Sequence, residues 1–341
     1  MGRSLSDLFI FVGKRLLQLI PVLLGVIILT FIVSHLRLTG LCNEWYPHAG
    51  ATTIANCEAK YGAPLTTQFW QYFTGLLGGN WGASVTGVQV YPAIAADLPA
   101  TVELVLAALF LMVVIGIPLG VIAAQYSGRL GDHLVRIFYL SGWATPTYLG
   151  AVIAAVFVGP ALGLPTSGEY STPTPPFTQF THMSVVDAAI ALNLPYTVDA
   201  IDHLILPAVV LAFINMGIAT RMTRASMLEV LPLDYVKSAR MKGLGEFWVM
   251  YKHALRNALI TTTTVLGITA GGLLAGTVVI EEVFDWPGIG QFAFTAIGGN
   301  GSTPNFDGAI AVVIIFAIAV VVANLVADIL YGLLDPRVDW R

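Results

Sequence analysis

The chain has 341 residues, of which 56% are hydrophobic and only 11% are charged, and its formal net charge at pH 7 is −4. Its mean hydropathy is +0.79. Soluble domains carry about a quarter charged residues, so this composition cannot supply a water-exposed surface and excludes an ordinary soluble protein.

Six stretches are apolar over the length of about 20 residues that a helix needs to cross a bilayer. In chain order they are Leu16–Leu36, Thr101–Ala124, Leu134–Val158, Leu204–Thr220, Ile260–Ile280 and Gly308–Gly332. The first has too many apolar residues for a secretion signal, so we expect a retained helix. The fourth is the weakest, because it is short and has Pro207 near its start. The pattern predicts an all-α membrane protein with six transmembrane helices.

The positive charges predict the orientation of these spans. If both termini lie on one side, that side receives 14 of the 16 Lys and Arg residues, and only Arg37 and Lys60 remain on the other. Cytoplasmic loops of membrane proteins carry the excess of Lys and Arg. We therefore expect a multi-pass protein of the cell membrane with both termini, and the basic segment Arg221–Arg256, in the cytoplasm.

The two cysteines, Cys42 and Cys57, fall in the first loop that this topology places outside the cell. Outside the reducing cytoplasm they can close that loop as a disulfide. Two unpaired thiols are the alternative.

The densest basic cluster lies in one internal segment, between the fourth and fifth spans. Gly243 and Gly245 interrupt a run that is otherwise compatible with a helix, which predicts a helix end and a turn. Beyond them the spacing predicts a short amphipathic helix, turned out of the bilayer and parallel to it, with Lys252, Arg256 and Val249 on its other side. Its apolar stripe consists of Phe247, Met250, Tyr251, Ala254, Leu255 and Ala258.

Three roles are open for this amphipathic helix. It can lie on the membrane surface, with its Lys and Arg near anionic lipid headgroups. It can bind nucleic acid, but a segment tethered between two membrane spans argues against that, and we expect no nucleic-acid partner. It can be a docking element for a cytoplasmic protein.

The residues of this segment resemble those of a known family. The stretch DYVKSARMKGLGEFWVMYKHALRNALI, from Asp234 to Ile260, is similar to the cytoplasmic loop of ABC importer permeases of the dipeptide, oligopeptide and nickel type. The general importer consensus is poorly kept, whereas the peptide-type pattern A-R-x-K-G-L…H-A-L-R-N-A is kept almost letter for letter. The resemblance implies a coupling helix-turn-helix that seats in a groove of an ATPase subunit. The residues that it assigns to this role are Lys237, Ser238, Ala239, Arg240, Lys242, Gly243, Leu244, Gly245, His253, Leu255 and Arg256.

The resemblance extends along most of the chain outside two external segments, Arg37–Asp97 and Pro160–His203. The further similar stretches are Leu98–Ala124, Asp132–Gly150, Leu204–Leu231, Val283–Ile297 and Asp328–Trp340. The family implies the type I ABC importer transmembrane fold. It divides the chain into an N-terminal helix with a long external loop (1–96), a permease core (97–332) with its coupling loop (221–259), and a short cytoplasmic C-terminus (333–341).

The function that the resemblance implies is half of a translocation pathway for di- or oligopeptides. The implied partners are a homologous second permease subunit, two ATPase subunits that bind ATP and Mg, and an extracytoplasmic solute-binding protein, with lipid around the spans. Oligosaccharides or nickel are alternative solutes. A self-sufficient secondary transporter or channel is the alternative from another class, but it would need mid-membrane ion sites and usually repeat symmetry, and neither is apparent.

The chain gives no sign of catalysis, and we expect no cofactor or metal of its own. A phosphate-binding G-x-x-x-x-G-K-[ST] loop does not occur in the sequence. The stretch GIGQFA from Gly288, with Asp307 beyond it, fits a dinucleotide fingerprint, but it lies between two spans without a βαβ unit. We interpret it as a tight external loop.

Four side chains are candidates to line a pathway through the spans: Tyr139, Trp143, Tyr148 and Asn215. Packing between helices is an equal alternative for them. Asp328 in the sixth span is a candidate functional carboxylate by the rarity of such groups in membranes. Its alternative is a shallow position near the basic loop or water.

Overall fold

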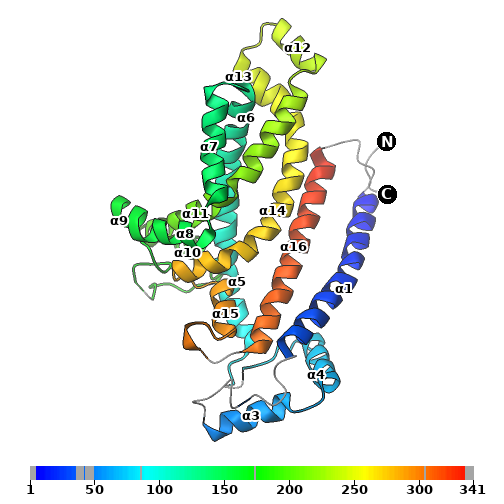
Figure 1. Cartoon of the computed structure of the whole chain (residues 1–341), viewed down its shortest axis with the longest axis vertical. Coiled ribbons are helices and arrows are strands. Elements are labelled where there is room, and N and C mark those ends of the chain that lie inside the picture. Colours follow the sequence, from blue (N-terminus) through cyan, green and yellow to red (C-terminus); the bar gives the residue numbers. More distant parts are fainter. Residues whose placement is uncertain are drawn as a thin grey trace.

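A computed structural model describes residues 5–35, 42, 50–84, 87–172, 174–302 and 305–334. Over this part of the chain the protein is built of helices (Figure 1), and the one extended pairing is an isolated bridge between Ala83 and Gln89. Most of the predicted C-terminal segment 333–341, including Arg337 and Arg341, lies outside the described residues.

The first half of the chain forms a peripheral helix, a cap at one end of the bundle and the first core helices. The elements are α1 (Leu5–His35), α3 (Ala51–Tyr61), α4 (Leu65–Leu77), α5 (Val90–Leu111), the π-helical turn η1 (Met112–Gly116), α6 (Ile117–Gln125), α7 (Leu130–Ala144), α8 (Thr147–Ile153), the π-helical turn η2 (Ala154–Val158), α9 (Gly159–Leu162) and α10 (Ser184–Ile190).

The second half contains the longest helices. The elements are α11 (Leu194–Val230), α12 (Asp234–Met241), α13 (Glu246–Trp248), the π-helical turn η3 (Val249–Ala254), α14 (Leu255–Val283), α15 (Ile289–Ala296), the 3-10 turn η4 (Gly299–Gly301) and α16 (Phe306–Leu334).

Five of the helices in the described residues are long and apolar enough to cross a membrane, and a sixth span results if the bent pair α7 and α8–α9 is counted as one. The continuous spans are Val12–Val33, Val90–Gln125, Leu194–Val230, Glu246–Val283 and Phe306–Ile329. The predicted fold class, an all-α membrane protein with six spans, is confirmed.

The third span, predicted over Leu134–Val158, is strongly bent. It is broken after Ala144, and its two halves meet at 102°. Pro146 has no backbone N–H to continue the helix, and it disfavours helical geometry in the residue before it. Thr145 is accordingly extended, with φ −80° and ψ 122°. A span predicted from apolar content alone cannot show this bend.

The fourth span was predicted as the weakest, and that prediction is wrong. It belongs to α11, a 37-residue helix with Pro207 inside it. This helix contacts α14, α6, α7 and α5, so it lies at the centre of the bundle. Its buried face carries small and polar residues such as Thr220, whose hydroxyl donates to the carbonyl of Gly116 in η1 at 3.1 Å. Apolar content identifies helices that face lipid better than helices that face protein.

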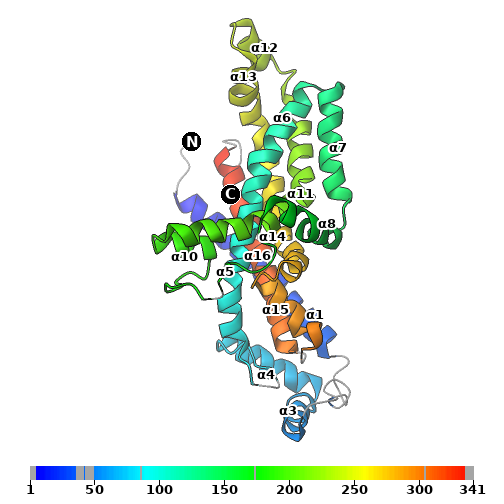
Figure 2. The same ribbon diagram turned by 90° about the vertical axis from the view of Figure 1, so that its left-hand side faces the viewer.

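Two groups of elements lie at opposite ends of the molecule (Figures 1 and 2). The turn between α12 and α13 protrudes at one end, and α3 and α4 form a cap at the other. Within the cap Cys42 and Cys57 form a disulfide, with their Cα atoms 5.9 Å apart. Cys57 is buried against Tyr61. The two sulfur atoms that the sequence placed in one loop are therefore paired.

The peripheral helix α1 packs on α16. Arg15 of α1 forms an ion pair with Asp328 of α16, with 2.9 Å between Nη2 and Oδ2. Asp328 was considered as a functional carboxylate or as a shallow group near the basic loop or water. Neither alternative predicted an ion pair with the first span. Arg15 is 47% exposed and Asp328 is 29% exposed, so the pair connects α1 to α16 at a partly open surface.

Candidate functional site

The segment between α11 and α14 protrudes from the bundle as a helical turn, which we call the tip. Eight consecutive residues of the tip, Met241–Trp248, are exposed to solvent. Four of them are large and apolar: Met241 is 80% exposed, and Leu244, Phe247 and Trp248 are between 42% and 64% exposed. An apolar surface on a protruding loop is typical of a contact with another protein.

The turn in the tip depends on one glycine. Gly243 has φ +78°, in the left-handed region, and a Cβ atom built on it would meet nothing within 4 Å. Its requirement for glycine is therefore conformational and not steric. Gly245 has φ −59° and ψ 143°, an ordinary extended conformation that any residue adopts. Of the two glycines that predicted the turn, the geometry of the chain requires the first.

An ion pair closes the turn. Arg240 at the end of α12 donates from Nη2 and Nε to the carboxylate of Glu246 at the start of α13, at 2.7 and 3.2 Å. This hydrogen-bonded pair raises the pKa of the Arg240 guanidinium above its usual value. Both side chains remain more than 40% exposed, so the pair contributes little stability by itself. It fixes the directions of the two short helices relative to each other.

The eleven residues assigned to coupling separate into three groups by exposure. Ala239 and Leu255 are buried, and Ala239 lies on α12, which packs on η3. Ser238 and His253 are half-buried, and the other seven are exposed: Lys237, Arg240, Lys242, Gly243, Leu244, Gly245 and Arg256. The exposed group can touch a partner, whereas the buried pair can only support it. Their coupling role stays a prediction.

The predicted amphipathic stripe beyond Gly245 is partly wrong. Phe247 is 64% exposed, although the stripe placed it on the buried face, and Val249, placed on the opposite side, is fully buried. The cause is η3, a π-helical segment over Val249–Ala254 that shifts the register of an ordinary helix. Phe247 instead stacks on Tyr251, with 4.7 Å between the ring centroids.

The predicted short helix parallel to the membrane is not a separate element either. α13, η3 and α14 follow one another without a break, as one continuous span over Glu246–Val283. Trp248, which the sequence analysis did not single out, is 58% exposed beside Phe247 on this helix. The signal that could have found it is the adjacent pair of aromatic residues directly after a turn.

The four candidate pathway residues are not brought to one surface. Tyr139 is buried between α7 and α11, where a Cβ atom on Gly217 would lie 3.1 Å from its ring. Trp143 is exposed and lies 5.2 Å from the guanidinium of Arg221. Tyr148 is exposed on α8, and Asn215 donates its amide to the Leu211 carbonyl of its own helix. The contacts of Tyr139 are those of helix packing, and a pathway role for the four remains a prediction.

The GIGQFA stretch begins α15: Gly288 directly precedes this helix, and the following residues form its first turns beside a buried carboxylate. Glu281 near the end of α14 accepts hydrogen bonds from the backbone of Gly290 at 2.7 Å and of Gln291 at 3.0 Å, both at the start of α15. A Cβ atom on Gly288 would lie 2.4 Å from the same carboxyl group, and one on Gly290 would lie 2.6 Å from the Val278 backbone. These glycines are needed for close packing. The prediction of a loop for this stretch is wrong from Ile289 onward, where the chain is helical, and Glu281 was not predicted to take part.

Three comparisons with known proteins agree with this geometry. The family model described as binding-protein-dependent transport system inner membrane component matches residues 116–340. A probable D,D-dipeptide transport system permease protein of Escherichia coli (strain K12) is 38% identical over 95% of this chain and 96% of its own. A dipeptide transport system permease protein of Alkalihalophilus pseudofirmus is 37% identical over 96% of this chain and 98% of its own.

A solved structure is similar in fold. It shows inward-facing conformations of the MetNI methionine ABC transporter, with a TM-score of 0.52 and 17% identity, and the match covers 69% of this chain and 93% of that chain. At this identity the likeness concerns the arrangement of helices alone.

Proposed function

Because this chain belongs to the family of binding-protein-dependent transport system inner membrane components, we propose that it is one permease subunit of an ATP-driven importer of di- or oligopeptides. The permeases that support this solute class are 33–38% identical to the chain and cover nearly all of it. Their names include dipeptide, di/tripeptide and oligopeptide transport systems.

The observation that carries the proposal is the tip. Its exposed apolar residues Leu244, Phe247 and Trp248 alternate with charged ones on a protruding turn. Adjacent exposed aromatic residues beside charged ones suit a protein groove, where aromatic side chains contribute most of the binding energy. We assign the tip to an ATPase subunit, which supplies the ATP hydrolysis and binds the Mg. The partner set is completed by a second permease subunit, a second ATPase subunit and a solute-binding protein.

The positive-inside distribution supports the orientation that this requires. The tip carries Lys237, Arg240 and Lys242 beside further basic residues of α11 and α14, and this concentration of positive charge supports a cytoplasmic position for it. The described ends of α1 and α16 point toward the same end of the molecule as the tip (Figure 1). Both termini are thus cytoplasmic in the proposal, and the α3–α4 cap faces outward, toward the binding protein.

The docking assignment is tested by truncating the exposed aromatics of the tip. We expect Phe247→Ser with Trp248→Ser to reduce co-purification of the cognate ATPase subunits by about tenfold or more, since buried aromatic contacts dominate interfaces. Leu77→Ser is the matched control, because Leu77 is 74% exposed and lies in α4 at the opposite end. ATPase recovery that is equal in all three proteins would refute the assignment.

The solute is tested separately by uptake. Proteoliposomes that contain the complete importer, with binding protein outside and ATP at the ATPase side, should accumulate labelled dialanine. Excess unlabelled oligopeptide should compete, whereas an oligosaccharide or Ni²⁺ should not. Competition by the sugar or the metal alone would replace the peptide assignment and leave the permease assignment in place.

A further inference from the structure

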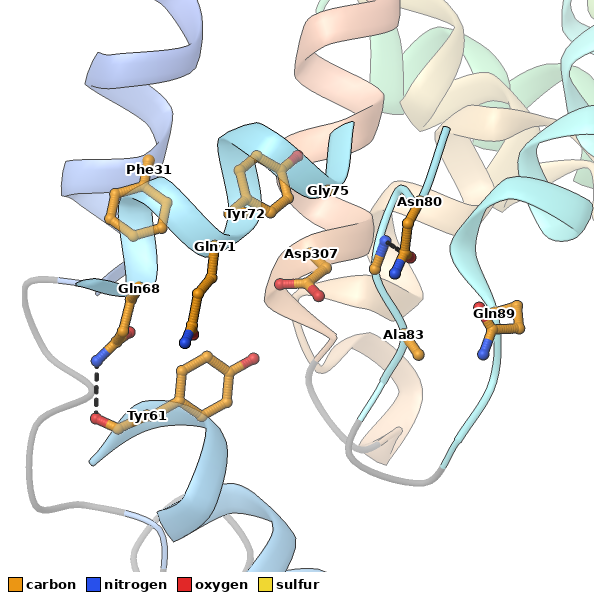
Figure 3. A pocket seen from close by; sticks show the side chains of 11 residues that line it. Phe31, Tyr61, Gln68, Gln71, Tyr72, Gly75, Asn80, Ala83, Gln89 and Asp307 are labelled. Carbon is orange, nitrogen blue, oxygen red and sulfur yellow. Dashed lines mark hydrogen bonds between the residues drawn. The ribbon is translucent and has the colours of Figure 1, made fainter. Parts of the chain in front are cut away.

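The helices α1 and α16 have a pocket at each end of their contact. One lies in the cap, where the C-terminal end of α1 and the start of α16 meet α3 and α4, and its volume is about 290 Å³ (Figure 3). The other, which we call the groove, lies near the opposite ends of the same two helices and has a volume of about 220 Å³. Every residue that lines the groove belongs to the spans Val12–Val33 or Phe306–Ile329. A ligand of the groove therefore comes from the bilayer.

The groove is polar at one end and apolar at the other. Val22 lies two turns beyond Arg15 on α1, and Val321 lies two turns before Asp328 on α16, and all four line the groove. The two helices run in opposite directions (Figure 1), so the two charged residues share one end and the two valines share the other. Val22 is 52% exposed, which leaves the apolar end open to lipid. A phospholipid has the same change of polarity along its length.

The charged end of the groove is electrically neutral. Nη2 of Arg15 lies 2.9 Å from Oδ2 of Asp328, and none of the other described residues that line the groove carries a charge. Both side chains are partly exposed, so a headgroup can approach them. An anionic headgroup would meet the carboxylate of Asp328 as well as the guanidinium. Charge complementarity therefore favours a headgroup that carries one charge of each sign.

One hydrogen-bond acceptor in the wall of the groove has no donor. The side chain of Asn324 is half-buried, and in the part of the chain that the structure describes its buried amide oxygen has no hydrogen-bond partner. Polar side chains within membrane spans normally bond to a neighbouring helix. Asn324 and Asp328 are four residues apart on α16, a spacing that puts their Cβ atoms about 5–6 Å apart on one face. A ligand group with several N–H donors can therefore reach both side chains.

From the neutral ion pair, the unpartnered amide oxygen and the change of polarity we infer that the groove binds phosphatidylethanolamine. The primary ammonium of this lipid donates to the Asn324 oxygen and to the Asp328 carboxylate, and the phosphate lies at the open edge beside Arg15. The acyl chains continue along Val22 and Val321. Phosphatidylcholine has the same net charge but no N–H donor. The binding does not depend on the proposed function; only its assignment to the cytoplasmic leaflet does.

Native mass spectrometry of the purified full chain in detergent tests the inference with lipids that share dioleoyl chains. We expect phosphatidylethanolamine to bind about tenfold more tightly than phosphatidylcholine, because the choline headgroup leaves the Asn324 oxygen without a donor. The N-methyl form of phosphatidylethanolamine keeps N–H donors and should bind like the parent lipid. Phosphatidylglycerol, which is anionic, should bind more weakly than phosphatidylethanolamine.

Variants locate the binding in the groove. Asn324→Leu removes the acceptor at similar volume, and it should reduce the preference for ethanolamine over choline to about threefold or less. Val321→Phe fills the apolar end and should weaken binding of phosphatidylethanolamine by about tenfold. Ser141→Leu is the control, because it also replaces an exposed polar side chain of a membrane helix, and the Ser141 hydroxyl already donates to the Phe138 carbonyl at 2.7 Å.

Thermal unfolding of each variant shows whether it is folded, and Val321→Phe decides if Asn324→Leu is not. Loss of the ethanolamine preference in the groove variants, with the preference kept in Ser141→Leu, would support the inference. Equal binding of the ethanolamine and choline lipids to the wild type, tighter binding of phosphatidylglycerol, or wild-type lipid binding by folded Asn324→Leu would each overturn it. The measurement uses the chain without ATPase or peptide, so its failure would leave the proposed function intact.

Discussion

The carboxylate of Glu281 accepts a hydrogen bond from the hydroxyl of Thr101, 180 residues earlier in the chain, at 2.8 Å. The same hydroxyl accepts from the backbone N–H of Ile289, and the Trp286 indole donates to the Ala100 carbonyl at 3.0 Å. One fully buried acid therefore ties α5, α14 and the turn before α15 together. The outer ends of these helices form a single unit.

This packing predicts a steric requirement at Gly288. Gly288→Ala should lower stability by about 1–3 kcal/mol, because the new methyl group would overlap Glu281 and Thr101. Gly272→Ala is the control, since a Cβ atom there meets nothing within 4 Å. Thermal unfolding of the two purified variants in detergent makes the comparison. Equal unfolding midpoints would show that the turn accommodates the new methyl group without loss of stability.

A second prediction concerns the ion pair between α7 and α11. Asp132 is fully buried and accepts from Nε and Nη2 of Arg224, both at 2.8 Å. Asp132→Ala should cost about 1–3 kcal/mol, because it leaves the partly buried guanidinium of Arg224 without its carboxylate partner. The exposed Asp234, which pairs with Lys237 at 3.2 Å, is the control.

Asp234→Ala should cost less than about 1 kcal/mol, as exposed ion pairs do. The double variant Asp132→Ala with Arg224→Ala should cost less than the two single changes added together. Strict additivity in unfolding measurements would contradict a direct interaction between the two side chains.

A third prediction is a pH dependence from the external loop before α10. Burial of its carboxyl group, together with the charges of Glu103, Asp97 and Asp187, raises the pKa of Glu169 from 4.5 to about 8. Between these values the folded chain binds a proton that the unfolded chain has released. This contribution to stability is therefore fully present below about pH 4.5 and is lost as the pH rises through about 8.

The unfolding midpoint of the wild type should fall across that window, and Glu169→Gln should flatten the dependence. The neutral amide cannot ionise, so the gain in stability should be largest above pH 8. Glu58→Gln, an exposed external control, should keep the wild-type slope. A Glu169→Gln protein with an unchanged pH profile would disprove the role of this carboxyl group.

A fourth prediction concerns the glycines of the tip. It distinguishes the effect of backbone strain from the effect of adding any side chain. Gly243→Val should disturb the turn by about 1–2 kcal/mol, because β-branched residues avoid positive φ, whereas Gly243→Asn should be tolerated. Gly245→Val should also be tolerated, since Gly245 has an ordinary conformation and open space around it. ATPase co-purification should fail for Gly243→Val alone. Failure of all three variants would show that the turn cannot accept any side chain.

The sequence predicted the number and approximate position of the spans because lipid-facing residues are directly visible as apolar runs. It failed where protein and not lipid surrounds a helix, as for α11. It also missed the register shift at η3, because nothing in the amino-acid sequence shows that a π-helical turn interrupts the 3.6-residue periodicity there. The outward position of Phe247 could not be predicted for that reason.

Polar pairs between residues far apart in the chain could not be predicted either. Arg15 with Asp328 and Thr101 with Glu281 join residues far apart in the chain, and nothing in the local pattern of either partner names the other. The division into parts at 96 and 332, and the roles of the residues in the tip and on the pathway, stay predictions.

The unbroken helix from Glu246 to Val283 has a mechanical consequence. At 1.5 Å per residue its 38 residues have a contour length of about 57 Å, and the helix bends along its course (Figure 1). Because this single helix connects Trp248 of the tip to the buried Glu281 with no loop between them, a displacement of the tip would be passed to the opposite end of the bundle through continuous backbone hydrogen bonds.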